Sequence, residues 1–101
     1  MNPLTAALRE RRPQHSLRIV DAHAHAGPYS LFFIPDAGPA AMVRVMDRCG
    51  VSHAVLSSHL AIQLDAAAGN AATAEVVGHA PGRFTGYLTV NPWQAPGCSR
   101  T

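Results

Sequence analysis

The chain has 101 residues, of which 48% are hydrophobic and 14% charged, a balance that fits a small globular domain. All eight basic residues are arginines, and with six acidic residues they give a formal net charge of +2, too small to indicate a nucleic-acid partner. No apolar run approaches the roughly 20 residues that span a membrane. We therefore expect a cytoplasmic protein in which Cys49 and Cys98, far apart in the sequence, are free thiols.

The first predicted element is a strand. Residues 1–16 form a polar extension, with a helical turn around Leu4–Leu8. The strand begins at Leu17–Val20, continues through the Asp-Ala-His-Ala-His segment and ends at Gly27-Pro28. The loop that follows, residues 29–38, is unusually apolar because residues 31–34 read Leu-Phe-Phe-Ile.

Helices and strands then alternate along the chain. We expect a helix from Pro39 to Cys49, ended by Gly50, and a second strand over His53–Ser57. A helix follows from an Asn70 N-cap to His79, and a third strand over Phe84–Val90. The residues expected to face inward are Met42, Val43, Val45, Met46, Ala71, Ala74, Val76 and Val77 in the helices, and Phe84, Tyr87 and Leu88 in the third strand.

The order strand, helix, strand, helix, strand predicts an α/β fold with a parallel sheet and right-handed crossovers. Two helices cannot cover both faces of a three-stranded parallel sheet, although such sheets are normally buried on both sides. A third helix is due after Pro92, yet residues 93–101 show neither periodicity nor caps. We therefore expect an irregular tail there and a fold that is part of a larger one.

The strongest candidate site lies at the end of the first strand. Residues two apart in a strand point to the same face, so Asp21, His23 and His25 should share one face and the intervening alanines the other. Two neutral imidazoles at this spacing can reach one divalent ion, and Asp21 could be a further ligand or could orient a histidine. The alternative is a strand end whose histidines only form hydrogen bonds.

Three segments in order resemble one family. "IVDAHAHAG" (residues 19–27) is similar to the first metal motif of the amidohydrolase superfamily. "MDRCGVSHAVLSS" (46–58) and "GNAATAEVVGHAPGRFTGYLTVNP" (69–92) resemble the next helix and strand units of its amidohydrolase-2 branch, which includes aminocarboxymuconate-semialdehyde decarboxylase-like enzymes. The resemblance covers residues 17–92.

This resemblance implies a (β/α)8 TIM barrel, which typically needs about 250 residues, so the chain would be its N-terminal fragment of three strands and two helices, truncated or frame-disrupted after residue 92. It assigns His23 and His25 as ligands of a divalent metal, zinc or else manganese, with Asp21 at the acidic position before them. The implied activity is metal-dependent hydrolysis or decarboxylation of a small organic acid, amide or ester. The remaining ligands and the catalytic aspartate of such enzymes lie on later strands. We therefore assign no catalytic residue and expect this fragment alone to be inactive.

Weaker predictions concern substrate contacts near the same end of the sheet. Phe32 and Phe33, in the loop that also holds Tyr29, could line an apolar substrate, or could simply pack within the loop. His59, directly after the second strand, and Asn91, at the end of the third, are further candidates. For them the simpler interpretations are a surface histidine and a cap of the Pro92 turn.

Two other functional interpretations stay open. The chain could be a non-catalytic βα module that self-associates or pairs with another chain, since an open barrel fragment exposes strand edges. It could also be a TatD-like metal nuclease, whose sequence likewise begins with histidines two apart, although the segment over residues 80–92 favours the amidohydrolase-2 branch.

Overall fold

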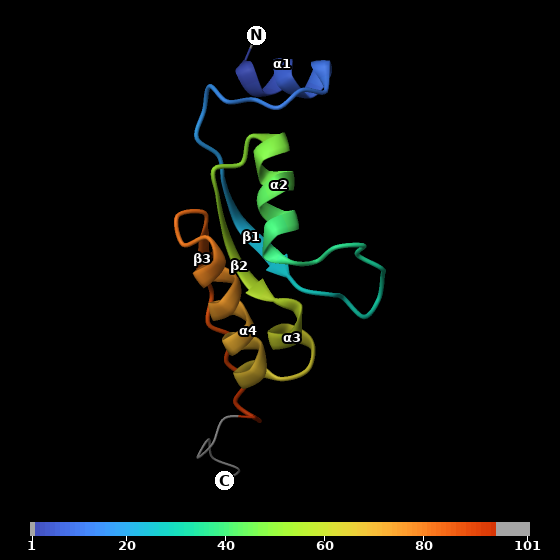
Figure 1. Ribbon diagram of the computed structural model, residues 1–101, viewed down its shortest axis with the longest axis vertical. Coiled ribbons are helices and arrows are strands. Elements are labelled where there is room, and N and C mark those ends of the chain that lie inside the picture. Colours follow the sequence, from blue (N-terminus) through green and yellow to red (C-terminus); the bar gives the residue numbers. More distant parts are fainter. Residues whose placement is uncertain (1, 95–101) are drawn as a thin grey trace.

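The computed structural model describes residues 2–94 and shows an α/β fold (Figure 1). The elements are α1 (Pro3–Glu10), β1 (Val20–Ala26), α2 (Pro39–Cys49), β2 (His53–Ser58), α3 (His59–Gln63), α4 (Ala66–His79) and β3 (Phe84–Gly86). The strands form one parallel sheet in the order β1-β2-β3. Among the described residues, no helix is both long and apolar enough to cross a membrane.

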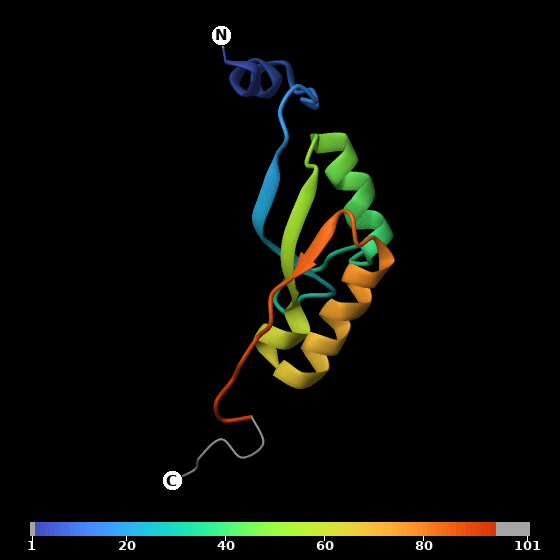
Figure 2. The ribbon, with the colours of Figure 1, turned by 90° about the vertical axis from the view of Figure 1, so that its left-hand side faces the viewer.

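The helices that pack on the sheet lie on one side of it (Figure 2). The core between sheet and helices consists of Ala26, Met46, Ala54, Leu56 and Phe84. In β2, Ala54 and Leu56 face the helices, so His53, Val55 and Ser57 point the other way. We call this second side the open face, because no described helix covers it.

The helix α2 has the predicted bounds, whereas α4 begins five residues earlier than predicted, with its N-cap at Asp65 and not at Asn70. Asp65 caps α4 by accepting a hydrogen bond from the Ala68 amide, at 2.8 Å. Asn70, the expected cap, instead lies inside the helix and bonds the Thr89 backbone through both its amide oxygen and its amide nitrogen, at 2.9 Å each. Asp and Asn are both good N-cap residues, and in this chain the cap forms at Asp65 and not at Asn70.

The earlier start also changes which side of α4 is buried. Val76 and Val77 pack against the core as predicted, but Ala71 and Ala74 are exposed. The tightest contacts are made by Gly69 and Thr73, whose small size lets α4 approach α3 and β2 closely. In α2, the predicted inward stripe holds except for Val45, which is exposed. The prediction for α4 was wrong because an alanine-rich helix has no clear apolar stripe, so its sequence does not determine which side faces the core.

The strand β3 is shorter than predicted. Pairing with β2 ends at Gly86, after which the Tyr87 amide donates one more bond to the Leu56 carbonyl, at 2.8 Å. The backbone at Thr89 is then held by Asn70 and leaves the ladder. Phe84 is buried as predicted, but Tyr87 and Leu88 are 51% and 75% exposed, so their assignment to the core was wrong.

The polar extension contains a full helix rather than one turn, and it is attached to the sheet. Gln14 is buried, accepts a hydrogen bond from the Leu17 amide and donates to the carbonyls of Leu17 and Gly50. These bonds take up the backbone groups just before the sheet, and β1 accordingly begins at Val20 rather than Leu17. The predicted irregular tail lies, from residue 95 on and including Cys98, outside the described residues.

Candidate metal centre

A β-bulge in β1 determines how the candidate ligands are oriented. Asp21 pairs with Ala54 and Ala24 pairs with Leu56, so two residues of β1, Ala22 and His23, lie opposite one residue of β2. A bulge of this kind interrupts the simple alternation of side chains and re-aims them. The strict i, i+2 pattern predicted for this segment therefore fails at its centre.

The two imidazoles converge on the open face beyond the bulge. The Nε2 atoms of His23 and His25 are 3.1 Å apart, and the ring centroids are 4.9 Å apart. Two nitrogens bound to one tetrahedral zinc at about 2.0–2.1 Å would be separated by about 3.3 Å, close to this distance. The structure thus brings together the pair that the sequence predicts, hereafter the histidine pair.

Ser57 of β2 orients the ring of His25. His25 Nδ1 lies 3.2 Å from the Ser57 carbonyl and 3.3 Å from the Ser57 hydroxyl. A carbonyl only accepts hydrogen bonds, so the contact with it requires the proton on Nδ1 and leaves the Nε2 lone pair free. In that tautomer the 3.1 Å contact between the two Nε2 atoms is donated by His23. A hydrogen bond from the second ring nitrogen to a carbonyl is the usual support of a metal-binding histidine.

Asp21 does not join the histidine pair, and this corrects the shared-face prediction. Its register partner is Ala54, which faces the helices, and Asp21 lines a cavity on that side together with Ala24 and Met42. Its Oδ1 accepts a hydrogen bond from the His23 backbone amide, at 3.0 Å. Asp21 therefore stabilises the bulge and does not contact either imidazole. Among residues 2–94, no group of three or more His, Cys, Asp and Glu residues is placed to hold a metal ion.

Two aromatic residues extend the site beyond the histidine pair. His59 is only 8% exposed, so the surface-histidine interpretation was wrong. Its ring lies 5.1 Å from that of His25 and 4.7 Å from that of Tyr29, measured between centroids. Its Nδ1–H donates to the Gly27 carbonyl, at 2.7 Å, which ties α3 to the turn after β1. The sequence signal for this role was weak, since only the position of His59 at the end of β2 pointed to the site.

The other predicted substrate contacts lie away from the histidine pair. Phe33 is 85% exposed, and Phe32 reaches only as far as Tyr29, with 4.7 Å between ring centroids. Asn91 accepts a hydrogen bond from the Trp93 amide and so caps the turn at Pro92, as the simpler interpretation holds. A separate polar contact occupies the other end of the open face, where His53 Nε2 accepts from the Thr85 hydroxyl at 2.7 Å.

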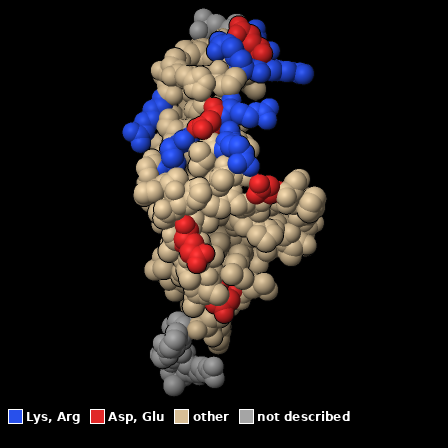
Figure 3. Space-filling view, viewed as in Figure 1, with Lys and Arg blue, Asp and Glu red and all other residues tan. Residues whose placement is uncertain are grey.

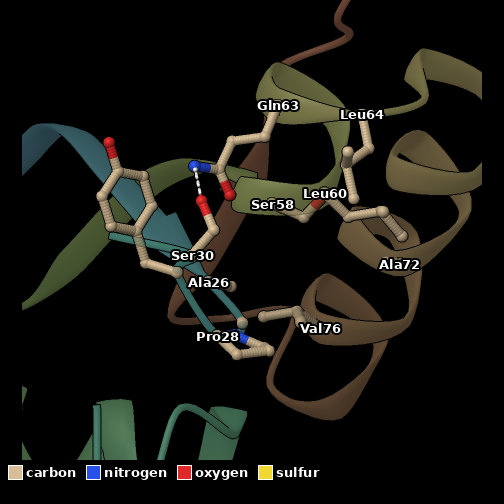
Figure 4. Close-up of a pocket in the computed structure, with 11 residues that line it drawn as sticks. Ala26, Pro28, Ser30, Ser58, Leu60, Gln63, Leu64, Ala72 and Val76 are labelled. Carbon is tan, nitrogen blue, oxygen red and sulfur yellow. Dashed lines mark hydrogen bonds between the residues drawn. The ribbon is translucent and has the colours of Figure 1, made fainter. Parts of the chain in front are cut away.

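An apolar cavity of about 410 Å³ lies next to this end of the sheet, between the turn after β1 and the helices α3 and α4 (Figure 4). It is lined by Ala26, Gly27, Pro28, Tyr29, Ser30, Ser58, Leu60, Gln63, Leu64, Ala72 and Val76. A hydrogen bond from Gln63 Nε2 to Ser30 Oγ, at 3.0 Å, crosses its rim. Tyr29 lines the cavity and also stacks on His59, but neither imidazole of the histidine pair lines it.

The arginine side chains gather in one half of the molecule. Figure 3 shows them around α1 and α2, in the half that holds the N-terminus, whereas acidic side chains lie in both halves. Among residues 2–94, three ion pairs link arginines to exposed carboxylates: Arg12–Glu10, Arg44–Asp36 and Arg83–Asp47. Such exposed pairs contribute little to stability.

No family model, no curated protein and no solved structure matches this chain.

Proposed function

We propose that the histidine pair binds a divalent metal ion, zinc before manganese, in a metal-dependent hydrolase or lyase of the amidohydrolase-2 type. The observation that supports this most directly is the 3.1 Å separation of the two Nε2 atoms on one face of a strand end. The Ser57 carbonyl adds to it, because it leaves one lone pair of His25 free for an ion. The sequence resemblance supplies the reaction class.

The one-sided sheet supports the proposal that these elements belong to a partial (β/α)8 barrel. In such a barrel the helices surround the strands, and side chains on the other face of the sheet fill the interior. The helices here lie on one side of the sheet. The histidine pair lies on the other, because His25 is paired with Ser57 and its Nε2 contacts that of His23, toward the C-terminal end of β1. That end is where barrel enzymes assemble their sites.

In this proposal the residues around the strand end have different roles. His23 and His25 hold the ion, the Ser57 carbonyl orients His25, and Asp21 maintains the bulge. His59 fixes the turn at Gly27 and packs the Tyr29 loop beside the site. A bound ion would polarise a carboxylate, amide or ester carbonyl of a small substrate. Catalytic zinc usually has three protein ligands, so further ligands must come from beyond the histidine pair.

Metal uptake by the purified chain tests this proposal. The chain is incubated with zinc or with manganese, freed of excess metal and analysed for bound metal. We expect the double variant His23→Ala, His25→Ala to lose the bound metal. The matched control is His15→Ala, His79→Ala, which changes two exposed histidines outside the site and should retain it. Equal metal content in the double variant and the unchanged chain would overturn the assignment.

A non-catalytic module is the second candidate function. It is favoured by the absence of a third ligand among residues 2–94 and by the uncovered face of the sheet. Sedimentation of the chain over a range of concentrations tests this candidate, and a monomer at every concentration would count against a module that pairs with another chain.

A further inference from the structure

We propose that the histidine pairs of two copies of this chain bind one zinc ion between them, so that four imidazoles complete its coordination. This inference rests on the metal binding proposed above and names the partner of that site. Its basis is a ligand set that is well formed but only half complete within one chain.

One chain supplies only half of the ligands of a closed zinc site. Protein zinc sites that lack an open position have four protein ligands in a tetrahedron. One chain supplies two converging Nε2 atoms, and no described group of three candidate ligands exists. Asp21, the nearest acidic candidate in the sequence, points to the helix side of the sheet. A two-fold axis through the ion would add the same two nitrogens from a second copy, because a two-fold interface presents one surface patch to its own duplicate.

The second step concerns how the copies approach. The bulge interrupts the outer edge of β1, and the Asp21 carboxylate already accepts from the His23 amide there. Bulges and acidic side chains at an edge prevent a further strand from pairing. The open face is not protected in this way: its register positions hold Val20, His25, His53, Val55, Ser57 and Thr85, and none of these has a permanent charge. Tyr87, also uncharged, crosses this face to the Ala22 carbonyl. Because the histidine pair lies on this face, two copies that share an ion meet face to face.

The third step makes the association depend on the metal. With strand spacings of about 4.8 Å and a rise of about 3.3 Å per residue, the open face of three short strands covers only roughly 300 Å². Stable interfaces bury about 800 Å² on each partner. Contact between the two open faces is thus too small to hold the copies together, and the four bonds to zinc must supply the rest. The resulting site has no open position, so a dimer held in this way corresponds to the non-catalytic module, the second candidate function above, and not to the hydrolase or lyase.

The test measures mass and metal together. Sedimentation velocity of the chain with zinc chloride, and again after removal of zinc with a chelator, should show dimer and monomer respectively. Metal analysis of the dimer should give one zinc for two chains. Cobalt(II) in place of zinc should show the intense visible bands of tetrahedral coordination.

Two variants and a control distinguish zinc binding from dimerisation. Val55→Arg places a charge on the open face but leaves both histidines intact, so it should bind zinc and remain monomeric. His23→Ala, His25→Ala should neither bind zinc nor dimerise, while His15→Ala, His79→Ala should do both. Circular dichroism confirms that each variant is folded.

The outcomes are distinct. One zinc per chain on a monomer overturns the shared site and leaves the proposed function standing. A dimer that persists without zinc, or in the double histidine variant, also overturns it. Absence of any zinc binding by the unchanged chain overturns both proposals.

Discussion

The two faces of β2 differ in what they contribute to the protein. On one face, Leu56 is fully buried, and Ala54 is nearly so, between β1, β3 and the helices. On the other, Val55 and His53 are only partly buried, and the side chains are mostly polar. Since successive residues of a strand alternate between faces, one six-residue segment both builds the core and supports the histidine pair. Stability is thus concentrated on the helix side, and the proposed metal site lies on the open face.

The largest predicted effect tests this division within β2. Leu56→Ala should lower the free energy of unfolding by about 3 kcal/mol, because it leaves a cavity in the core. The neighbouring change Val55→Ala should lower it by less than about 1 kcal/mol, because no described helix packs on that side. Urea unfolding followed by circular dichroism measures both. Equal losses would show that the open face is covered in solution.

A second pair of variants tests the packing on the helix side alone. A Cβ at Gly69 would lie 2.1 Å from the backbone of Ala61, so Gly69→Ala should push α4 away from α3 and cost roughly 2 kcal/mol. A Cβ at Gly78 meets nothing within 4 Å, and Gly78→Ala should stabilise the helix by up to about 1 kcal/mol. Thermal unfolding of the two variants should shift in opposite directions. Shifts of the same sign would contradict the close approach of α3 and α4.

The smallest predicted effect lies on the open face. The Tyr87 hydroxyl donates to the Ala22 carbonyl at the bulge, at 3.1 Å, in a solvent-exposed setting. Tyr87→Phe removes this bond and should cost about 0.5 kcal/mol, at the low end for a hydrogen bond. The same unfolding measurement applies. A loss above about 1.5 kcal/mol would indicate that Tyr87 is an important part of the fold.

Much of the architecture follows from the sequence. The apolar runs, Pro39, Gly50 and the Pro81-Gly82 stop predict the alternating order of elements, because these signals act over a few residues each. The bounds of α2 follow for the same reason, and Gly50 has the left-handed conformation, with φ 77°, that a helix end favours. The bounds of α4 and β3 do not follow, because the partners of Asn70 and Tyr87 lie far away in the sequence.

The site divides in the same way. The convergence of His23 and His25 is predictable from their spacing, and the structure contains it. The side of the sheet on which Asp21 lies is not predictable. Strict alternation assumes a regular ladder, and no residue of β1 indicates in the sequence that a bulge forms there. The contribution of His59 also depends on tertiary structure, since it lies 32 positions after its partner Gly27 and only the folded sheet brings its ring to His25. Local spacing therefore predicts that the two imidazoles converge, whereas the long-range contacts that support them appear only in the folded structure.

The bulge in β1 also determines what a deletion in this segment would do. Because of the extra residue at Ala22 and His23, the alternation of side chains between the two faces starts anew after the bulge. Loss of a single codon there would remove the extra residue and leave a regular ladder, with Asp21 still opposite Ala54 and His25 still opposite Ser57. The carboxylate would stay on the helix side and the imidazole on the open face, because the pairs on either side of the bulge are already in phase with β2. A shift of one residue in the pairing of the segment before the bulge, and not the loss of a residue, is the change that would turn the Asp21 carboxylate toward the histidine pair.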